Sequence, residues 1–178
     1  MSSCELIVFK NGLPDSSVEF KNSWGGATRI WSALFDAYVP KKDKYDSYLS
    51  SDPHDRRLWD IATRKDVQLF ERAVHAFTFD SFYVSKEHFE QLAIDLLLFV
   101  EKYPCPGRVD HLPAWAKWLQ ENKDADAVAL YGTSVGDNLW YRPKRCEHCD
   151  NYLDEEEPVP MSEGTEVYEW MKMICEKQ

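Results

Sequence analysis

Residues 86–102, with the sequence KEHFEQLAIDLLLFVEK, carry the strongest helix signal in the chain. Their apolar side chains recur at intervals of three, four and seven residues, which places them on one face of an α-helix. These side chains are Phe89, Leu92, Ala93, Leu96, Leu97 and Val100. Ser85, directly before the stretch, is a favourable N-cap residue, and Pro104 follows where the helix has to end. The stretch therefore predicts one long helix with a buried face.

The N-terminal segment predicts a small sheet. Glu5–Phe9 (ELIVF) is a short apolar run that contains β-branched residues, and Ser17–Phe20 alternates polar and apolar side chains. Asn11 and Gly12 lie between the two runs and are typical of turns. We expect these segments to pair as a β-hairpin.

The remaining segments indicate an α+β fold. Helical spacing predicts helices over residues 27–39, 55–65, 66–79, 114–122 and 165–176, and Ala127–Tyr131 reads as a strand. Helices and strands do not alternate regularly, which favours a mainly helical α+β domain with a small antiparallel sheet including the N-terminal β-hairpin. The length of 178 residues suggests one domain, residues 1–178. Residues 142–163 show little periodicity and are predicted as an irregular acidic loop within that domain.

Composition limits the classes of partner. The chain has 31 acidic and 21 basic residues and a net charge of −10. A negative surface repels phosphates, so we expect no direct binding of nucleic acid or of anionic membranes. Five cysteines, with no signal segment and no apolar run near the roughly 20 residues that cross a bilayer, predict a cytoplasmic protein with free thiols.

Most of the charge imbalance lies near the C-terminus. Residues 137–178 hold 11 of the acidic residues and only 5 of the basic ones. A concentrated acidic surface accelerates association with a basic partner and can occupy a nucleic-acid site on another protein. The leading hypothesis is therefore a non-catalytic module that binds a protein partner with a basic surface. Its expected partner-binding residues are Trp140, Tyr152, Asp150, Asp154, Glu155, Glu156 and Glu157.

Small, acidic, aromatic-rich chains of this kind resemble many accessory proteins of phages and mobile elements. The resemblance rests on composition and on no motif. It implies an inhibitor of a basic, nucleic-acid-handling host protein, acting through the acidic surface.

A small hydrolase-type enzyme is the first alternative. Residues 132–136 match G-x-S-x-G after a predicted strand, with Ser134 in the position of a nucleophile. The helix that should follow such a serine is absent from the pattern, because the next residues run into Pro143. His111, beside Asp110, and His148 are the candidate general bases.

A zinc-stabilised structural protein is the second alternative. Cys146 and Cys149 have the C-x-x-C spacing with which two thiolates grip one zinc ion. A structural site needs four ligands, and the others would have to come from Cys105, His111, Cys4 or Cys175. No cofactor is expected in the leading hypothesis; this alternative implies one structural zinc.

Overall fold

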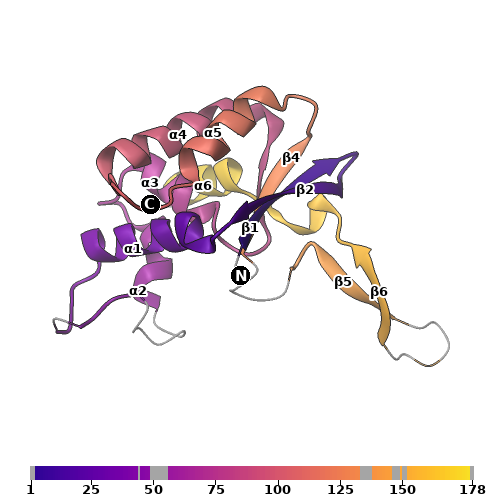
Figure 1. Ribbon diagram of the computed structural model, residues 1–178, viewed down its shortest axis with the longest axis horizontal. Coiled ribbons are helices and arrows are strands. Elements are labelled where there is room, and N and C mark those ends of the chain that lie inside the picture. Colours follow the sequence, from indigo (N-terminus) through magenta and orange to yellow (C-terminus); the bar gives the residue numbers. More distant parts are fainter. Residues whose placement is uncertain are drawn as a thin grey trace.

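A computed structural model describes residues 3–43, 45–48, 56–132, 138–145, 149 and 152–176, without the side chains of residues 153 and 154. The fold is α+β, as predicted, and helices pack against a mainly antiparallel five-stranded sheet that begins with a β1–β2 hairpin (Figure 1). The strand order is β2-β1-β4-β3-β7. These strands are β1 (Ser3–Lys10), β2 (Leu13–Lys21), β3 (Phe82–Ser85), β4 (Ala127–Gly132) and β7 (Thr165–Glu166). Only the short β3–β7 pair is parallel among the described strands.

The helices follow the predicted ranges closely. The α-helices are α1 (Ala27–Tyr38), α2 (Arg56–Trp59), α3 (Leu69–Ala76), α4 (Phe89–Lys102), α5 (Leu112–Glu121) and α6 (Val167–Glu176). Short 3-10 turns accompany them: η1 (Ser23–Gly25), η2 (Asp60–Thr63), η3 (Lys86–His88) and η4 (Met161–Glu163). The helix predicted over residues 86–102 consists of η3 followed directly by α4.

The two faces of the sheet are covered by different parts of the chain. Successive side chains of a strand point to opposite faces, and β1 is buried on both. Leu6 and Val8 belong to the large core under the helices, whereas Ile7 and Phe9 belong to a second, smaller cluster. Trp140 completes that cluster from a distant part of the sequence.

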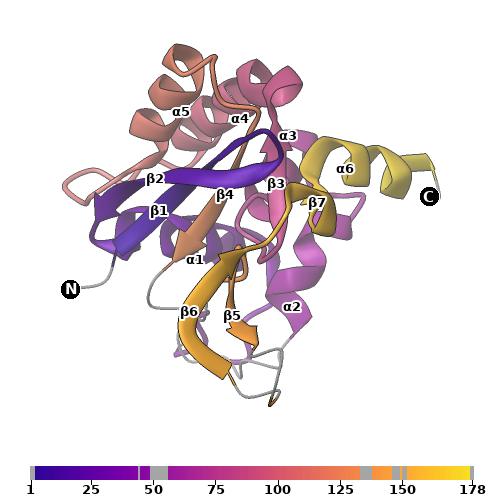
Figure 2. The same cartoon turned by 90° about the vertical axis from the view of Figure 1, so that its right-hand side faces the viewer.

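A second sheet of two strands extends away from this body. The strands β5 (Tyr141–Arg145) and β6 (Tyr152–Pro158) pair antiparallel with each other. We call this pair the arm. In Figure 1 it lies at the lower right, on the side away from α1 and α2, and Figure 2 shows it extending below the main sheet. The prediction of an irregular loop over residues 142–163 is therefore wrong for residues 142–145 and 152–158, which are strands, and residues 146–148, 150 and 151 lie outside the described part of the chain.

A buried carboxylate links three helices. Glu71, in the first turn of α3, is fully buried. It accepts hydrogen bonds from the Tyr38 hydroxyl of α1 at 2.7 Å, from Lys102 Nζ of α4 at 2.9 Å and from the Tyr103 hydroxyl. Its carboxylate also closes a capping box with Gln68 at the start of α3. Burial and the neighbouring carboxylate raise the pKa of Tyr103, so that this phenol stays protonated and donates.

Candidate functional site

Ion pairs join the two strands of the arm to each other and to the η4 turn. Arg142 Nε lies 2.6 Å from Glu157 Oε1, and its Nη1 lies 3.3 Å from Glu163 Oε2. Lys144 Nζ lies 3.2 Å from Glu155 Oε2. Because these pairs are exposed to solvent, each one contributes little to stability by itself. β5 alternates its charges at Arg142 and Lys144, whereas β6 carries a continuous acidic run, so neither strand has the apolar periodicity by which a strand is predicted.

The acidic run of β6 is divided between the two faces of the arm. Residues two apart share a face, so Arg142 and Lys144 face the carboxylates of Glu155 and Glu157, and that face is largely neutralised. Glu156 lies on the opposite face, across from Pro143, which carries no charge. Among the described side chains, Glu156 has no ion-pair partner. The described side chains of β5 and β6 balance in charge, with three basic residues (Arg142, Lys144 and Arg145) against three acidic ones (Glu155, Glu156 and Glu157), and Glu156 is the acid among them that is open to a basic partner.

Tyr152 is exposed, as expected for a partner-binding residue. Its side chain is 65% exposed at the start of β6. The guanidinium of Arg145 lies 5.1 Å from the centre of its ring, and Arg145 Nη2 donates to the Tyr152 hydroxyl at 3.1 Å. A cation over an aromatic face is attracted by the ring quadrupole. This contact holds Tyr152 in place on the surface of the arm.

Trp140, which was also expected to be exposed, is buried. Only 3% of its surface is accessible. Its ring packs edge-on against Phe9 at a centroid distance of 4.8 Å, and its carbonyl accepts the backbone N–H of Val159 at 2.9 Å. A Cβ added at Gly164 would lie 2.4 Å from Cη2 of the indole. Trp140 therefore anchors the arm on the sheet and is not available to a partner.

Several of the predicted site residues lie outside the described part of the chain. Asp150, Ser134, His148 and Cys146 belong to ranges that the structure does not describe, and the same holds for the side chain of Asp154. Cys149 is described and exposed. Within the described residues, no group of three or more His, Cys, Asp or Glu side chains is arranged to hold a metal ion.

The thiol of Cys105 forms hydrogen bonds within the protein. Its Sγ accepts a hydrogen bond from Arg29 Nε at 3.1 Å and donates to Asp110 Oδ2 at 3.5 Å. Arg29, on α1, also pairs with Asp110 at 3.0 Å and donates to the Tyr103 carbonyl at 2.8 Å. This buried arginine fastens the loop between α4 and α5 to α1. A cavity of about 850 Å³ lies beside it, also lined by the exposed Trp24.

His111 makes a structural contact with the η1 turn. Its Nε2 lies 2.8 Å from the Asn22 carbonyl oxygen. A carbonyl can only accept, so Nε2 carries the hydrogen and donates it. The ring also packs closely on Gly25, where a Cβ would come within 2.9 Å of it. His111 thus holds the η1 turn against the start of α5.

A Ser–His–Glu group, which the sequence analysis missed, has the composition of a catalytic relay but not its geometry. Ser85 Oγ lies 3.3 Å from His88 Nδ1, and Glu166 Oε1 lies 3.0 Å from the same nitrogen. A relay needs the hydroxyl and the carboxylate on different ring nitrogens. The group instead fastens β7 and the start of α6 to η3, and Glu166 Oε2 accepts the Glu169 N–H at 2.8 Å.

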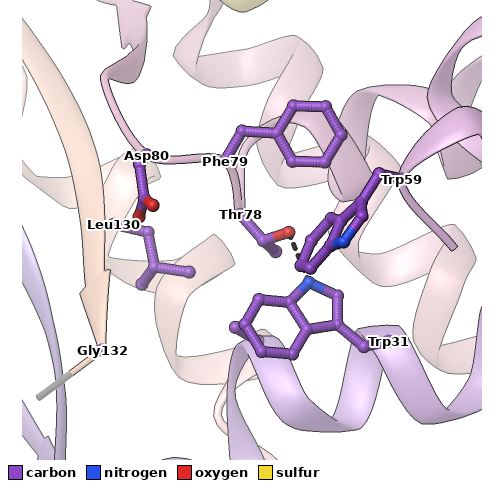
Figure 3. Close-up of a pocket in the computed structure, with 8 residues that line it drawn as sticks. Trp31, Trp59, Thr78, Phe79, Asp80, Leu130 and Gly132 are labelled. Carbon is purple, nitrogen blue, oxygen red and sulfur yellow. Dashed lines mark hydrogen bonds between the residues drawn. The ribbon is translucent and has the colours of Figure 1, made fainter. Parts of the chain in front are cut away.

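A pocket of about 500 Å³ opens between α1, α2, the end of α3 and the end of β4. We call it the tryptophan pocket. Figure 3 shows Trp31, Trp59 and Phe79 on one side of it, with Asp80 and Leu130 opposite. The described residues that line it are Ala27, Trp31, Trp59, Thr78, Phe79, Asp80, Leu130 and Gly132. They come from separate elements at no regular spacing, so the sequence carries no signal for this site.

The aromatic side of the tryptophan pocket is rigidly held. Trp31 Nε1 donates to Thr78 Oγ1 at 2.8 Å (Figure 3). The Thr78 hydroxyl in turn donates to the His75 carbonyl at 2.6 Å. The rings of Trp31 and Trp59 are nearly perpendicular, at 78° and 5.3 Å, and Trp59 and Phe79 meet at 70° and 5.9 Å. Such edge-to-face contacts are the favoured arrangement of aromatic pairs.

His75 lies behind this aromatic side. Its ring stacks on Trp59 at 6.1 Å and meets Phe79 edge-on at 4.9 Å. It is fully buried, and neither ring nitrogen has a hydrogen-bond partner in the described part of the chain. Burial lowers the pKa of His75 to about 3. The imidazole is therefore neutral and adds no positive charge to the pocket.

Fold and site together define an α+β protein with a projecting two-stranded arm and an aromatic pocket. In the described residues, no helix has the length and apolar character needed to cross a bilayer. Comparisons with protein-family models, with curated proteins and with solved structures find no match. The function therefore has to be argued from the geometry.

Proposed function

We propose that this chain is a non-catalytic protein-binding module whose docking element is the arm. The observation that carries the proposal is that β5 and β6 leave the body and pair only with each other in the described structure (Figures 1 and 2). An isolated two-stranded hairpin is marginally stable in water. Here Trp140 and cross-strand ion pairs support it. Such support is expected if the arm has to keep its projecting shape in order to bind a partner.

The edges of the arm supply a way to bind. An unpaired strand edge presents backbone N–H and C=O groups that another chain can pair with. Alternating side chains then give specificity. On β6 these include Tyr152 and Glu156, which are both exposed. Tyr152 is an aromatic residue of the kind enriched at interfaces, and Glu156 is a carboxylate that forms no ion pair with the side chains that the structure describes.

Charge favours a partner with a basic surface. Residues 137–178 carry most of the net negative charge of the chain, and complementary fields raise association rates and exclude wrong partners. In its most specific form, the proposal is that the arm inhibits a basic, nucleic-acid-handling protein by occupying its phosphate-binding surface. This role is the one expected of a cytoplasmic accessory protein of a phage or mobile element.

The test is affinity capture from an extract of the source cells, with bound proteins quantified by mass spectrometry. A variant with residues 154–157 changed to Ser is expected to lose the partner captured by the unchanged chain. The matched control removes four acids from the exposed surface of the helical body, as Glu90→Ser, Glu101→Ser, Glu121→Ser and Asp124→Ser. If the control loses the partner equally, or if the arm variant retains every partner, the proposal is wrong.

A further inference from the structure

We propose that the tryptophan pocket is a binding site for an organic cation with a methylated ammonium head group. This inference is independent of the role of the arm. It rests on the aromatic walls of the pocket, on the carboxylate of Asp80, which has no partner among the described residues, and on the lack of free hydrogen-bonding or basic groups among the described lining residues.

The walls suit a compact, weakly hydrated cation. A ring face attracts a cation within about 6 Å of its centre, by about 0.5–2 kcal/mol for each contact. Trp31 meets Trp59 at 78° and Trp59 meets Phe79 at 70°, so the three rings line the pocket at steep angles to one another and not as two parallel walls. A volume of about 500 Å³ is within the range of small-molecule sites. A rounded ammonium group fits such an arrangement of rings better than a planar ring system does.

Asp80 supplies the opposite charge. It lies across the pocket from the aromatic rings (Figure 3). Its carboxylate has no hydrogen bond or ion pair with any other described residue. Partial burial raises the pKa of Asp80, in keeping with the absence of a neighbouring cation or donor. A bound cation would supply the missing partner.

The remaining polar groups argue against a neutral polar ligand. The Trp31 N–H and the Thr78 hydroxyl are already hydrogen-bonded to protein groups. None of the described lining residues is basic, and His75 behind them is neutral. A sugar or a nucleobase needs several matched donors and acceptors, whereas a methylated ammonium needs only ring faces and a carboxylate.

This head group has two sources, a free quaternary ammonium compound or a methylated lysine side chain of another protein. Two probes separate them. Choline represents the free compound, and a short peptide carrying one trimethyllysine, compared with the same peptide carrying unmodified lysine, represents the protein source. Whichever binds more tightly identifies the source, and either order supports the cation site.

The decisive comparison uses the unchanged full chain in isothermal titration calorimetry. Choline and 3,3-dimethylbutan-1-ol are titrated separately into the protein. The second compound has the same shape as choline, with a carbon atom in place of the charged nitrogen. We expect the better of the cationic probes to bind with a Kd below about 10 mM, and the neutral isostere to bind at least about tenfold more weakly than choline. Equal binding of isostere and choline, or no binding of any cationic probe, would overturn the proposal.

Two variants locate the site. Asp80→Asn is expected to weaken binding of the cation by about tenfold, while Asp124→Asn, before the opposite end of β4, leaves it unchanged. Trp59→Leu removes one ring face and weakens binding, whereas Trp24→Leu, at an exposed tryptophan outside the pocket, does not. Circular dichroism establishes that each variant is folded. Equal effects of Asp80→Asn and Asp124→Asn would place binding elsewhere and contradict the proposal.

Discussion

The indole ring of Trp140 rests so closely on the backbone of Gly164 that the two residues leave no room for a Cβ between them. Trp140 precedes the arm and Gly164 follows it, so their contact closes the root of the arm on the sheet. Phe9 and Val159 complete the cluster around the indole. The position of the arm therefore depends on the body through this contact.

Removing this anchor should loosen the arm. Replacing a buried tryptophan by alanine costs about 3–5 kcal/mol, and we expect Trp140→Ala to approach that loss in urea unfolding. Amide hydrogen exchange in β5 and β6 should rise more than exchange in β1 and β4. Trp24→Ala, at a side chain that is 55% exposed, is the control. Equal exchange in the arm and the body of the Trp140 variant would contradict the anchoring role.

The carboxylate of Glu71 should be a major source of stability in the helical body. An amide in its place accepts at only one atom, so Glu71→Gln leaves donors from Tyr38, Lys102 or Tyr103 without a partner. A lost hydrogen bond to a buried charged group costs about 1.5–3 kcal/mol, and we expect a loss of roughly 2–3 kcal/mol. The exposed Glu101→Gln should change the free energy of unfolding by less than about 0.5 kcal/mol. Similar losses in both variants would show that the Glu71 network contributes nothing specific.

His75 should make the protein less stable in mild acid. Its folded-state pKa of about 3 lies below the ordinary value of 6.5, so between these values the unfolded chain binds a proton that the folded protein does not. Stability attributable to His75 is complete above the ordinary value and falls as the pH decreases towards the folded pKa. From about pH 7 to about pH 5 the loss is about 2 kcal/mol.

The check is urea unfolding of the original chain and of His75→Phe over this pH range. The other titrating groups are common to both proteins, so the difference between the two curves isolates the imidazole. The phenylalanine variant should lose about 2 kcal/mol less than the original chain. Parallel curves would mean that the imidazole is protonated or solvated in the folded protein.

Regular apolar patterns explain which parts of the fold are predictable. The helix after Ser85 buries one face against a single core, and its apolar spacing of three and four residues follows from this. The first strand of the hairpin is buried on both faces and is recognised as a continuous apolar run. The arm buries few apolar side chains, so its strands have no apolar periodicity. Its first strand instead alternates the basic residues Arg142 and Lys144 with other residues. The burial of Trp140 could not be predicted from the sequence, because it depends on which distant strands form the second face of the sheet. The tryptophan pocket is harder still, since Trp31, Trp59 and Asp80 meet only in the folded chain.

Charge reversal at Glu156 tests the docking role of the arm most directly. Glu156→Lys changes the carboxylate on the arm that has no described ion-pair partner, whereas Asp124→Lys makes the same change of net charge on an exposed loop of the body. Capture of the partner from cell extract is compared for both variants at low and at high salt. The proposal predicts that Glu156→Lys retains less than about a tenth of the partner while Asp124→Lys retains it. Full retention by Glu156→Lys would contradict the assignment of the arm as the docking element.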